Sequence, residues 1–276
     1  MSDKVPDRPT VAQRLLDVVG EDGVSLSEPL SEHITFKIGG PADVFVAPDS
    51  IESAERAIAV CREEGVPFFV LGRGSDLLVS DLGYRGVIIC MADALDDLVV
   101  EDEKLVCQAG VTLSDAAEMA CALGLTGLEF ACGIPGTVGG AVFMNAGAYG
   151  GQIADVLESV RVVDAAGEVR EMGVDELDLG YRHSRIADDG LFVLSATFAL
   201  EPGDEAEIRA TMVDLTERRE EKQPLELPSA GSTFKRPEGH FAGKLISDAG
   251  LQGYRHGGAE VSTKHAGFVV NVGDAT

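Results

Sequence analysis

Two glycine-rich segments of the sequence have the composition of loops that bind phosphate groups. The first is Gly72-Arg73-Gly74-Ser75-Asp76-Leu77, and the second is Gly133-Ile134-Pro135-Gly136-Thr137-Val138-Gly139-Gly140-Ala141. Because glycine has no Cβ and allows positive φ, its backbone N–H groups can approach a diphosphate closely. Neither segment is a Walker loop or a Rossmann fingerprint. Each alone is more typical of a plain turn, but two in one chain predict a dinucleotide cradle of another type.

The distribution of charge suggests a second kind of site. The formal net charge is −25, yet residues 228–276 hold five Lys or Arg against four Asp or Glu and carry +1. The other 227 residues hold 17 against 43 and carry −26. A near-neutral region in so acidic a protein favours a local anion site. Its basic side chains are Lys235, Arg236, Lys244, Arg255 and Lys264, and it also holds His240, His256 and His265.

Composition excludes several classes of protein. A net charge of −25 argues against nucleic acid and anionic membranes as partners. No apolar run could span a bilayer, and residues 1–22 have no signal-peptide core, so we expect a cytoplasmic protein without membrane insertion. No obligate protein partner is evident. Neither the five histidines nor the five cysteines have metal-binding spacings, so we expect no metal site and mostly buried, reduced thiols at Cys61, Cys90, Cys107, Cys121 and Cys132.

Strands and helices that alternate along the chain must position these segments. Apolar periodicity predicts strands at 42–47, 68–71, 86–91, 104–108, 191–200 and 267–272, with a hairpin at 158–164 and 168–172. Ser50 is a predicted N-cap for a helix with an apolar stripe at Ile51, Ala54, Ile58 and Cys61. Further helices are predicted at 112–123 and 203–221. This order, over 276 residues, predicts an α+β fold of two or three lobes.

Six motifs give the sequence a more specific resemblance. LGRGSDLLVSD, GLEFACGIPGTVGGAVFMNAGAYGG, YRHSRI, KQP, SAGSTFKRP and GGAEVSTKHAGFVVN occur in this order over nearly the whole chain. Together they resemble the UDP-N-acetylenolpyruvoylglucosamine reductase (UDP-N-acetylmuramate dehydrogenase) family, in the shorter type without an insertion near YRHS. The resemblance implies a vanillyl-alcohol-oxidase (PCMH) type of fold, in which FAD lies noncovalently between two αβ lobes and a third lobe closes over a UDP-sugar.

The same resemblance implies a division of the chain and an activity. Residues 1–30 would form an N-terminal extension, 31–88 and 89–202 the two FAD-binding lobes, and 203–276 a C-terminal substrate-binding lobe that is apparently truncated. The implied reaction is the NADPH-dependent reduction, through FAD, of the enolpyruvyl ether UDP-N-acetyl-3-O-(1-carboxyvinyl)-glucosamine. Its product is UDP-N-acetylmuramate, a precursor of cell-wall peptidoglycan.

Five residues match or border positions with roles in the family reaction. That reaction builds charge on the substrate carboxylate and protonates a carbon, so it needs a cation and a proton donor. Arg182 in YRHS matches the arginine that holds the carboxylate, and Ser232 in GSTF matches the proton donor. Without the motifs, Arg182 would be typical of a surface ion pair and Ser232 of a turn. Lys222 in KQP matches a lysine near the diphosphate, and Lys264 and Tyr149 are further candidates for substrate contacts.

Two features depart from the family pattern. The first loop reads GSD instead of GSN, so a carboxylate at Asp76 would weaken FAD binding if it pointed at the pyrophosphate. The family also continues past Asn271 with a helix and a Pro-Glu-Val-Arg strand whose glutamate assists protonation, whereas this sequence ends at Thr276. No other residue is assigned that role. We therefore expect low turnover, and an exposed apolar edge along a strand at Phe268–Val272.

Two other functions stay open from the sequence. Oxidases of this fold commonly carry a GGH motif for a histidyl–flavin bond, whereas Gly257-Gly258 is followed here by Ala259. A noncatalytic protein that binds flavin or a UDP-sugar is the other alternative. Substrate-dependent oxidation of NADPH would support the reductase alone.

Overall fold

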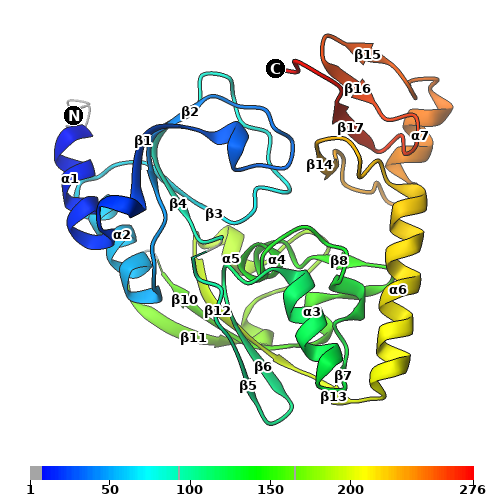
Figure 1. The fold of residues 1–276 in the computed structure, drawn as a ribbon, viewed down its shortest axis with the longest axis horizontal. Helices are drawn as coiled ribbons and strands as arrows, with labels where there is room; N and C mark the ends of the chain where they lie inside the picture. Colours follow the sequence, from blue (N-terminus) through cyan, green and yellow to red (C-terminus); the bar gives the residue numbers. More distant parts are fainter. Residues whose placement is uncertain (1–7, 93, 165) are drawn as a thin grey trace.

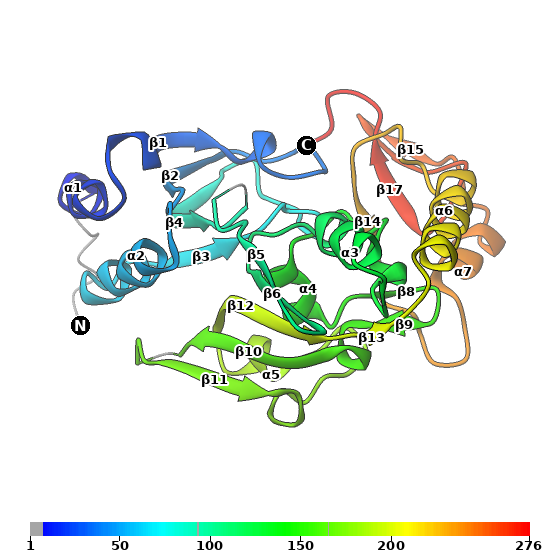
Figure 2. The same ribbon diagram turned by 60° about the horizontal axis from the view of Figure 1, so that its bottom comes forward.

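Three larger sheets, one in each lobe, organise the chain in the computed structural model (Figure 1). The structure describes residues 8–92, 94–164 and 166–276, so residues 1–7 of the predicted N-terminal extension lie outside the described residues. In both views the third lobe lies at the opposite end of the molecule from the first helix (Figure 1 and Figure 2). The α+β fold and the three lobes predicted from the sequence are confirmed.

The first lobe is a four-stranded sheet of order β1-β2-β4-β3. Ser50 caps α2 as predicted, and its hydroxyl accepts the N–H of Ser53. The strand β1 falls inside the predicted N-terminal extension, and β4 continues past residue 88, so this sheet is longer at both ends than the predicted lobe of residues 31–88. The elements are α1 (Arg8–Val19), β1 (Val24–Pro29), β2 (Pro41–Val46), α2 (Ile51–Glu63), β3 (Phe68–Leu71) and β4 (Tyr84–Cys90).

The second lobe is a five-stranded antiparallel sheet of order β11-β10-β12-β6-β5. The predicted hairpin is confirmed as β10 and β11, which pair from Ser159–Gly173 to Val163–Val169. The elements are β5 (Leu98–Glu101), β6 (Lys104–Gln108), α3 (Leu113–Ala122), α4 (Val138–Met144), β10 (Leu157–Val163), β11 (Val169–Gly173), α5 (Arg185–Asp188) and β12 (Phe192–Ala199).

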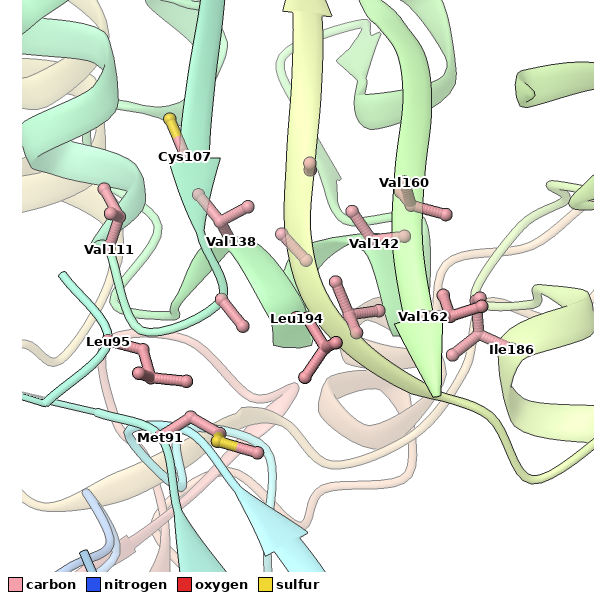
Figure 3. Packing of buried hydrophobic residues seen from close by; sticks show 14 of the residues in the cluster. Met91, Leu95, Cys107, Val111, Val138, Val142, Val160, Val162, Ile186 and Leu194 are labelled. Carbon is pink, nitrogen blue, oxygen red and sulfur yellow. The ribbon is translucent and has the colours of Figure 1, made fainter. Parts of the chain in front are cut away.

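One contiguous hydrophobic core joins the first and second lobes. Figure 3 shows Cys107, Val142 and Leu194 among the packed side chains of the second lobe, with Met91 on the side toward the first lobe. The partly buried guanidinium of Arg62, in the first lobe, donates to the carbonyl oxygen of Asp164 in the second and lies 5.6 Å from the centre of the Phe192 ring. Because close-packed cores resist shear, these two lobes form one frame.

The third lobe follows the long helix α6 and contains a four-stranded sheet of order β14-β17-β16-β15. The predicted exposed edge at Phe268–Val272 is wrong, because β17 pairs with β14 on one side and with β16 on the other. The strand β16 is the second neighbour of β17, and its short sequence shows no clear alternation of apolar and polar residues by which it could have been predicted. The elements are α6 (Glu205–Lys222), β14 (Ser229–Ser232), α7 (Ala242–Asp248), β15 (Arg255–His256), β16 (Ala259–Val261) and β17 (Phe268–Asn271).

A segment of the first lobe supplies part of the core of the third. Ile34, Phe36 and Ile38 are buried and pack against Ala230 and Val269 of the third-lobe sheet. The third lobe is therefore attached both through α6 and through residues 34–38.

Short elements complete the chain. These are η1 (Glu21–Gly23), η2 (Leu30–Glu32), β7 (Leu125–Thr126), η3 (Glu129–Ala131), β8 (Gly147–Ala148), β9 (Gly151–Gln152), η4 (Ile153–Asp155), η5 (Val174–Glu176) and β13 (Glu201–Pro202).

None of the helices in the described residues is both long and apolar enough to cross a membrane.

Candidate active site

The first glycine-rich loop follows the carboxyl end of β3. Gly74 has a φ of 57° and lies so close to Ile34 that a Cβ would stand 2.5 Å from its Cγ2. Only glycine fits this combination of positive φ and close approach. The backbone N–H groups of Gly74, Ser75 and Asp76 donate no hydrogen bond to any described residue. The loop therefore presents a row of donors that remain available to a ligand.

The second glycine-rich segment leads into α4. Thr137 caps this helix, and its hydroxyl accepts the N–H of Gly140 at 3.4 Å. The N–H of Gly139 donates to the carbonyl of Ala109 at 2.9 Å, and a Cβ on Gly139 would lie 3.0 Å from the Ala109 Cβ. The N–H groups of Ile134 and Val138 are likewise used inside the protein. These predicted FAD-binding residues therefore shape the loop, whereas their N–H groups are already engaged.

The fold brings the two loops together. A Cβ on Gly72 would lie 2.4 Å from the Thr137 hydroxyl, and one on Gly136 would lie 3.5 Å from Ser75 Oγ. Beside them is a cavity of about 270 Å³, lined among others by Arg73 of the first loop. A cradle of adjoining glycines with unused N–H groups next to a hollow fits the pyrophosphate of a dinucleotide such as FAD.

Arg182 lies in a tight turn that is fastened to the end of α4. Its φ is 54°, a left-handed conformation uncommon for arginine, and its guanidinium donates to the carbonyls of Asn145 at 3.5 Å and Gly147 at 3.3 Å. The buried side chain of Asn145 donates in turn to the carbonyl of Gly180 at 3.0 Å. Ser184, also buried, donates to the Phe143 carbonyl at 2.6 Å. The backbone is thus held in a conformation that sets where Arg182 points.

Asn145 is a residue that the sequence analysis did not select. It ends α4 in the left-handed conformation and makes three side-chain hydrogen bonds, including one in which its Oδ1 accepts the N–H of Ala154 at 3.0 Å. Its place just after a glycine-dense helix is a signal for such a cap.

The first loop, the Arg182 turn and the third lobe meet at Asp76. Partial desolvation raises the pKa of the Asp76 carboxyl above its ordinary value, and the positive charges of Arg182 and Lys235 oppose this rise. The Lys235 ammonium donates to the carbonyl of Arg182 at 3.2 Å, and the N–H of Arg236 donates to the Tyr181 hydroxyl at 3.2 Å. Two cations therefore lie beside the first glycine-rich loop, one from each of the other lobes.

Ser232 lies at the end of β14, in the same third-lobe segment as Lys235. It is exposed and pairs with Phe268 of β17, while Ser229 pairs with Val270. A bulge separates these two pairs, with Gly231 at a φ of 75°. Bulges redirect side chains and often occur next to active sites.

Tyr149 and Arg219 form another part of the junction. Tyr149 is half-exposed with a φ of 55°, between the two short strands β8 and β9. Desolvation lowers the pKa of the half-buried Arg219 guanidinium, while Tyr149 and Cys132 raise it. A Cβ on Gly133 would lie 2.8 Å from Arg219 Cδ. Gly133, predicted to bind the cofactor, therefore makes room for Arg219, a cation that sequence reasoning missed.

The two predicted substrate lysines differ in their surroundings. Lys222 is exposed in the last turn of α6 and makes no ion pair with a described residue. The Lys264 ammonium donates to the carbonyl of Glu220 at 2.6 Å and lies 3.8 Å from the Glu226 carboxylate, so it already caps the end of α6. Next to Lys222, the amide oxygen of Gln223 is buried without a partner among the described residues. Of the two lysines, Lys222 is the one open to a ligand.

Family models match both parts of this arrangement. Residues 42–173 match the FAD binding domain, which includes both glycine-rich loops. Residues 223–276 match the C-terminal domain of UDP-N-acetylenolpyruvoylglucosamine reductase, which includes Ser232 and Lys264.

Whole-chain comparisons agree with these matches. UDP-N-acetylenolpyruvoylglucosamine reductase of Clostridium beijerinckii is 52% identical over 93% of this chain and 84% of its own length. The crystal structure of the reductase of Thermus caldophilus has a TM-score of 0.78 and 36% identity, over 91% of this chain and 88% of that one. The fold alone is shared with p-cresol methylhydroxylase, at a TM-score of 0.53 and 15% identity over 71% of this chain and 43% of that one. The chain therefore belongs to the UDP-N-acetylenolpyruvoylglucosamine reductase family of FAD-dependent oxidoreductases.

Proposed function

We propose that this protein reduces the enolpyruvyl ether of a UDP-sugar to UDP-N-acetylmuramate with NADPH as the reductant, a step of peptidoglycan precursor synthesis. The observation that carries the proposal is the meeting of three parts from three lobes. These are the glycine cradle, the constrained Arg182 turn and the third-lobe segment that holds Ser232 and Lys235.

The cradle formed by Gly72, Gly74, Ser75 and Gly136 would hold the pyrophosphate of FAD. When bound there, FAD supplies hydride exchange between NADPH and the carbon–carbon double bond of the substrate. The chain itself must therefore bind the two substrates, hold the reacting carbon near the flavin and manage charge and protons.

Arg182 would bind the substrate carboxylate. Its planar fork suits a carboxylate, and its present acceptors are only neutral carbonyls at 3.3–3.5 Å, which an anion can displace. Negative charge that develops on this carboxylate during reduction would be stabilised there.

Ser232 would then deliver a proton to the carbon next to the carboxylate. Its hydroxyl has no side-chain hydrogen bond to a described residue, so it is free to turn toward a substrate.

The diphosphate of the UDP moiety would lie near the end of α6. Lys222 is open to solvent there, and Arg219 presents a half-buried guanidinium one helical turn earlier, without a carboxylate partner among the described residues. Tyr149 lies next to Arg219 and would form a wall of the same site.

The test is NADPH consumption by the FAD-loaded protein with and without the enolpyruvyl UDP-sugar, with product mass as a second readout. The proposal expects consumption only with this substrate and a product heavier by two hydrogens. UDP-N-acetylglucosamine, which lacks the double bond, is the matched control. Oxygen-dependent turnover of other alcohols would instead identify an oxidase, and tight binding of the UDP-sugar without NADPH consumption would identify a binding protein.

A further inference from the structure

Thr35 bonds to two parts of the site at once. Its backbone N–H donates to the carbonyl of Gly74 in the flavin loop at 3.3 Å. Its side-chain Oγ1 donates to the carbonyl of Ser229 at 2.6 Å, at the start of the strand that ends at Ser232. One residue therefore connects the first glycine-rich loop with strand β14 of the third lobe.

The neighbours of Thr35 leave it little freedom. Ile34 and Phe36, on either side, are buried in the small core shared with Ala230 and Val269. The Phe36 carbonyl also accepts from the side chain of Asn271 at 3.3 Å. These contacts attach the third lobe whether or not the Thr35 hydroxyl is present, so the fold does not depend on that hydroxyl alone.

The short distance along β14 makes the Ser229 bond relevant to Ser232. Only Ala230 and Gly231 separate the two serines, and the bulge lies in this interval. With Ser229 fixed by Thr35 and Ser232 paired with Phe268, the conformation at Gly231 determines where the Ser232 hydroxyl lies.

We propose that Thr35 is a positioning residue that aligns Ser232 with the flavin by tying β14 to the Gly74 loop. The inference rests on the proposed function, because it takes Ser232 as the proton donor. Without the Thr35 hydroxyl, β14 keeps its pairing with β17 but loses its direct hydrogen bond to the first lobe at Ser229. Since Ser232 belongs to the third lobe and the Gly74 loop to the first, a small shift between these lobes would separate the proton donor from the reacting carbon.

The test compares Thr35→Val, which keeps the shape and loses the hydroxyl, with Thr35→Ser, which keeps the hydroxyl. Flavin reduction by NADPH and flavin reoxidation by the UDP-sugar are followed separately by stopped flow. We expect Thr35→Val to slow flavin reoxidation by about ten- to hundredfold and to leave flavin reduction unchanged. The reason is that a misplacement of about 1 Å between reacting groups can slow a reaction by about a hundredfold. Thr35→Ser should restore the wild-type rate. Thr35→Ala serves in the same way if the valine variant does not fold.

Thr211→Val is the matched control. The Thr211 hydroxyl also donates to a backbone carbonyl, that of Glu207 at 3.0 Å, but on the exposed surface of α6. This variant should leave both half-reactions unchanged. A second readout does not involve turnover: hydrogen exchange of peptides that cover β14 should be faster in Thr35→Val than in the wild type or in Thr35→Ser.

The proposal is overturned if Thr35→Val slows both half-reactions equally, slows neither, or leaves exchange in β14 unchanged. A failure of the proposed function has a different signature. In that case Ser232→Ala does not affect reoxidation, whereas exchange in β14 still reports whether Thr35 holds the strand.

Discussion

Arg182 and Ser232 are positioned by different means. Arg182 belongs to a turn that is locked by the side chains of Asn145 and Ser184, so its guanidinium is set before any ligand arrives. Ser232 is exposed and follows a bulge in the sheet of another lobe. The proposed anion binding by Arg182 and the proposed proton delivery by Ser232 therefore depend on separate parts of the molecule, and variants should affect them separately.

Ser232→Ala should impair only the half-reaction that involves the UDP-sugar. General acid catalysis is typically worth about 10²–10⁴-fold, so we expect flavin reoxidation to slow by about that factor. Flavin reduction by NADPH should not change, because the cradle and Arg182 are intact. Stopped-flow absorbance of the two half-reactions decides this, and equal slowing of both would remove Ser232 from the proton-donor role.

Asp76→Asn should strengthen FAD binding by removing a carboxylate beside the proposed pyrophosphate site. The pKa of Asp76 is raised by desolvation, so the carboxyl is neutral below that raised value and charged above it. Wild-type FAD affinity should therefore fall as pH rises through this pKa, whereas the variant should show no such step. Fluorescence titration of the apoprotein across acidic to neutral pH measures both effects.

Asp175→Asn, at η5 away from the cradle, changes net charge equally and is the control for Asp76→Asn. If the two variants behave alike, the effect is one of overall charge and Asp76 has no special place in the site.

At the scale of elements, the sequence predicted helices and strands correctly where their signals are local. The capped α2 and the β10–β11 hairpin were predicted because a serine cap and regular periodicity are local signals. The helix α4 was missed because Gly139 and Gly140 are poor helix formers. Tertiary contact overrides that preference, since Gly139 packs directly on Ala109. The strand β1 was missed because most of its side chains are exposed.

The sequence indicated which residues belong to the proposed site more readily than which of those residues contact one another. Motifs identified both glycine loops, but the contact of Gly72 with Thr137 joins two lobes and has no local signal. The same holds for Arg219 and Thr35, whose roles depend on neighbours far along the chain.

The cysteines allow a test of burial in individual elements. Burial raises the pKa of Cys61 on α2 and of Cys107 on β6 to about 12. At mildly alkaline pH only about one such thiol in ten thousand is the reactive thiolate. We expect an aromatic disulfide reagent to leave both unlabelled in the native protein and to label all five cysteines after denaturation, as mass spectrometry of peptides would show.

Cys132, the one cysteine of partial exposure, should be the first to react. Rapid native labelling of Cys61 or Cys107, in the wild type or in a Cys132→Ser background, would mean that α2 or β6 opens readily and that the shared core is loose.

At the scale of the whole molecule, both glycine-rich loops that we propose to bind FAD lie in the first two lobes, whereas Gly257-Gly258-Ala259 lies in the third. We predict that the purified protein is yellow and that acid precipitation releases its FAD into the supernatant. Flavin absorbance of supernatant and pellet measures this, with a covalent histidyl flavoprotein as the control. Flavin that remains in the pellet would contradict the prediction.

The packing of Ile34, Phe36 and Ile38 into the third lobe has a consequence for folding during synthesis on the ribosome. Residues 34–38 leave the ribosome long before β17 does, so this contact cannot form until the strands of the third lobe have been translated. Contacts between distant residues also form late in folding, because a long loop must close first. Nascent chains stalled before β14 should therefore be able to acquire FAD, while Ile34, Phe36 and Ile38 are still exposed to chaperones.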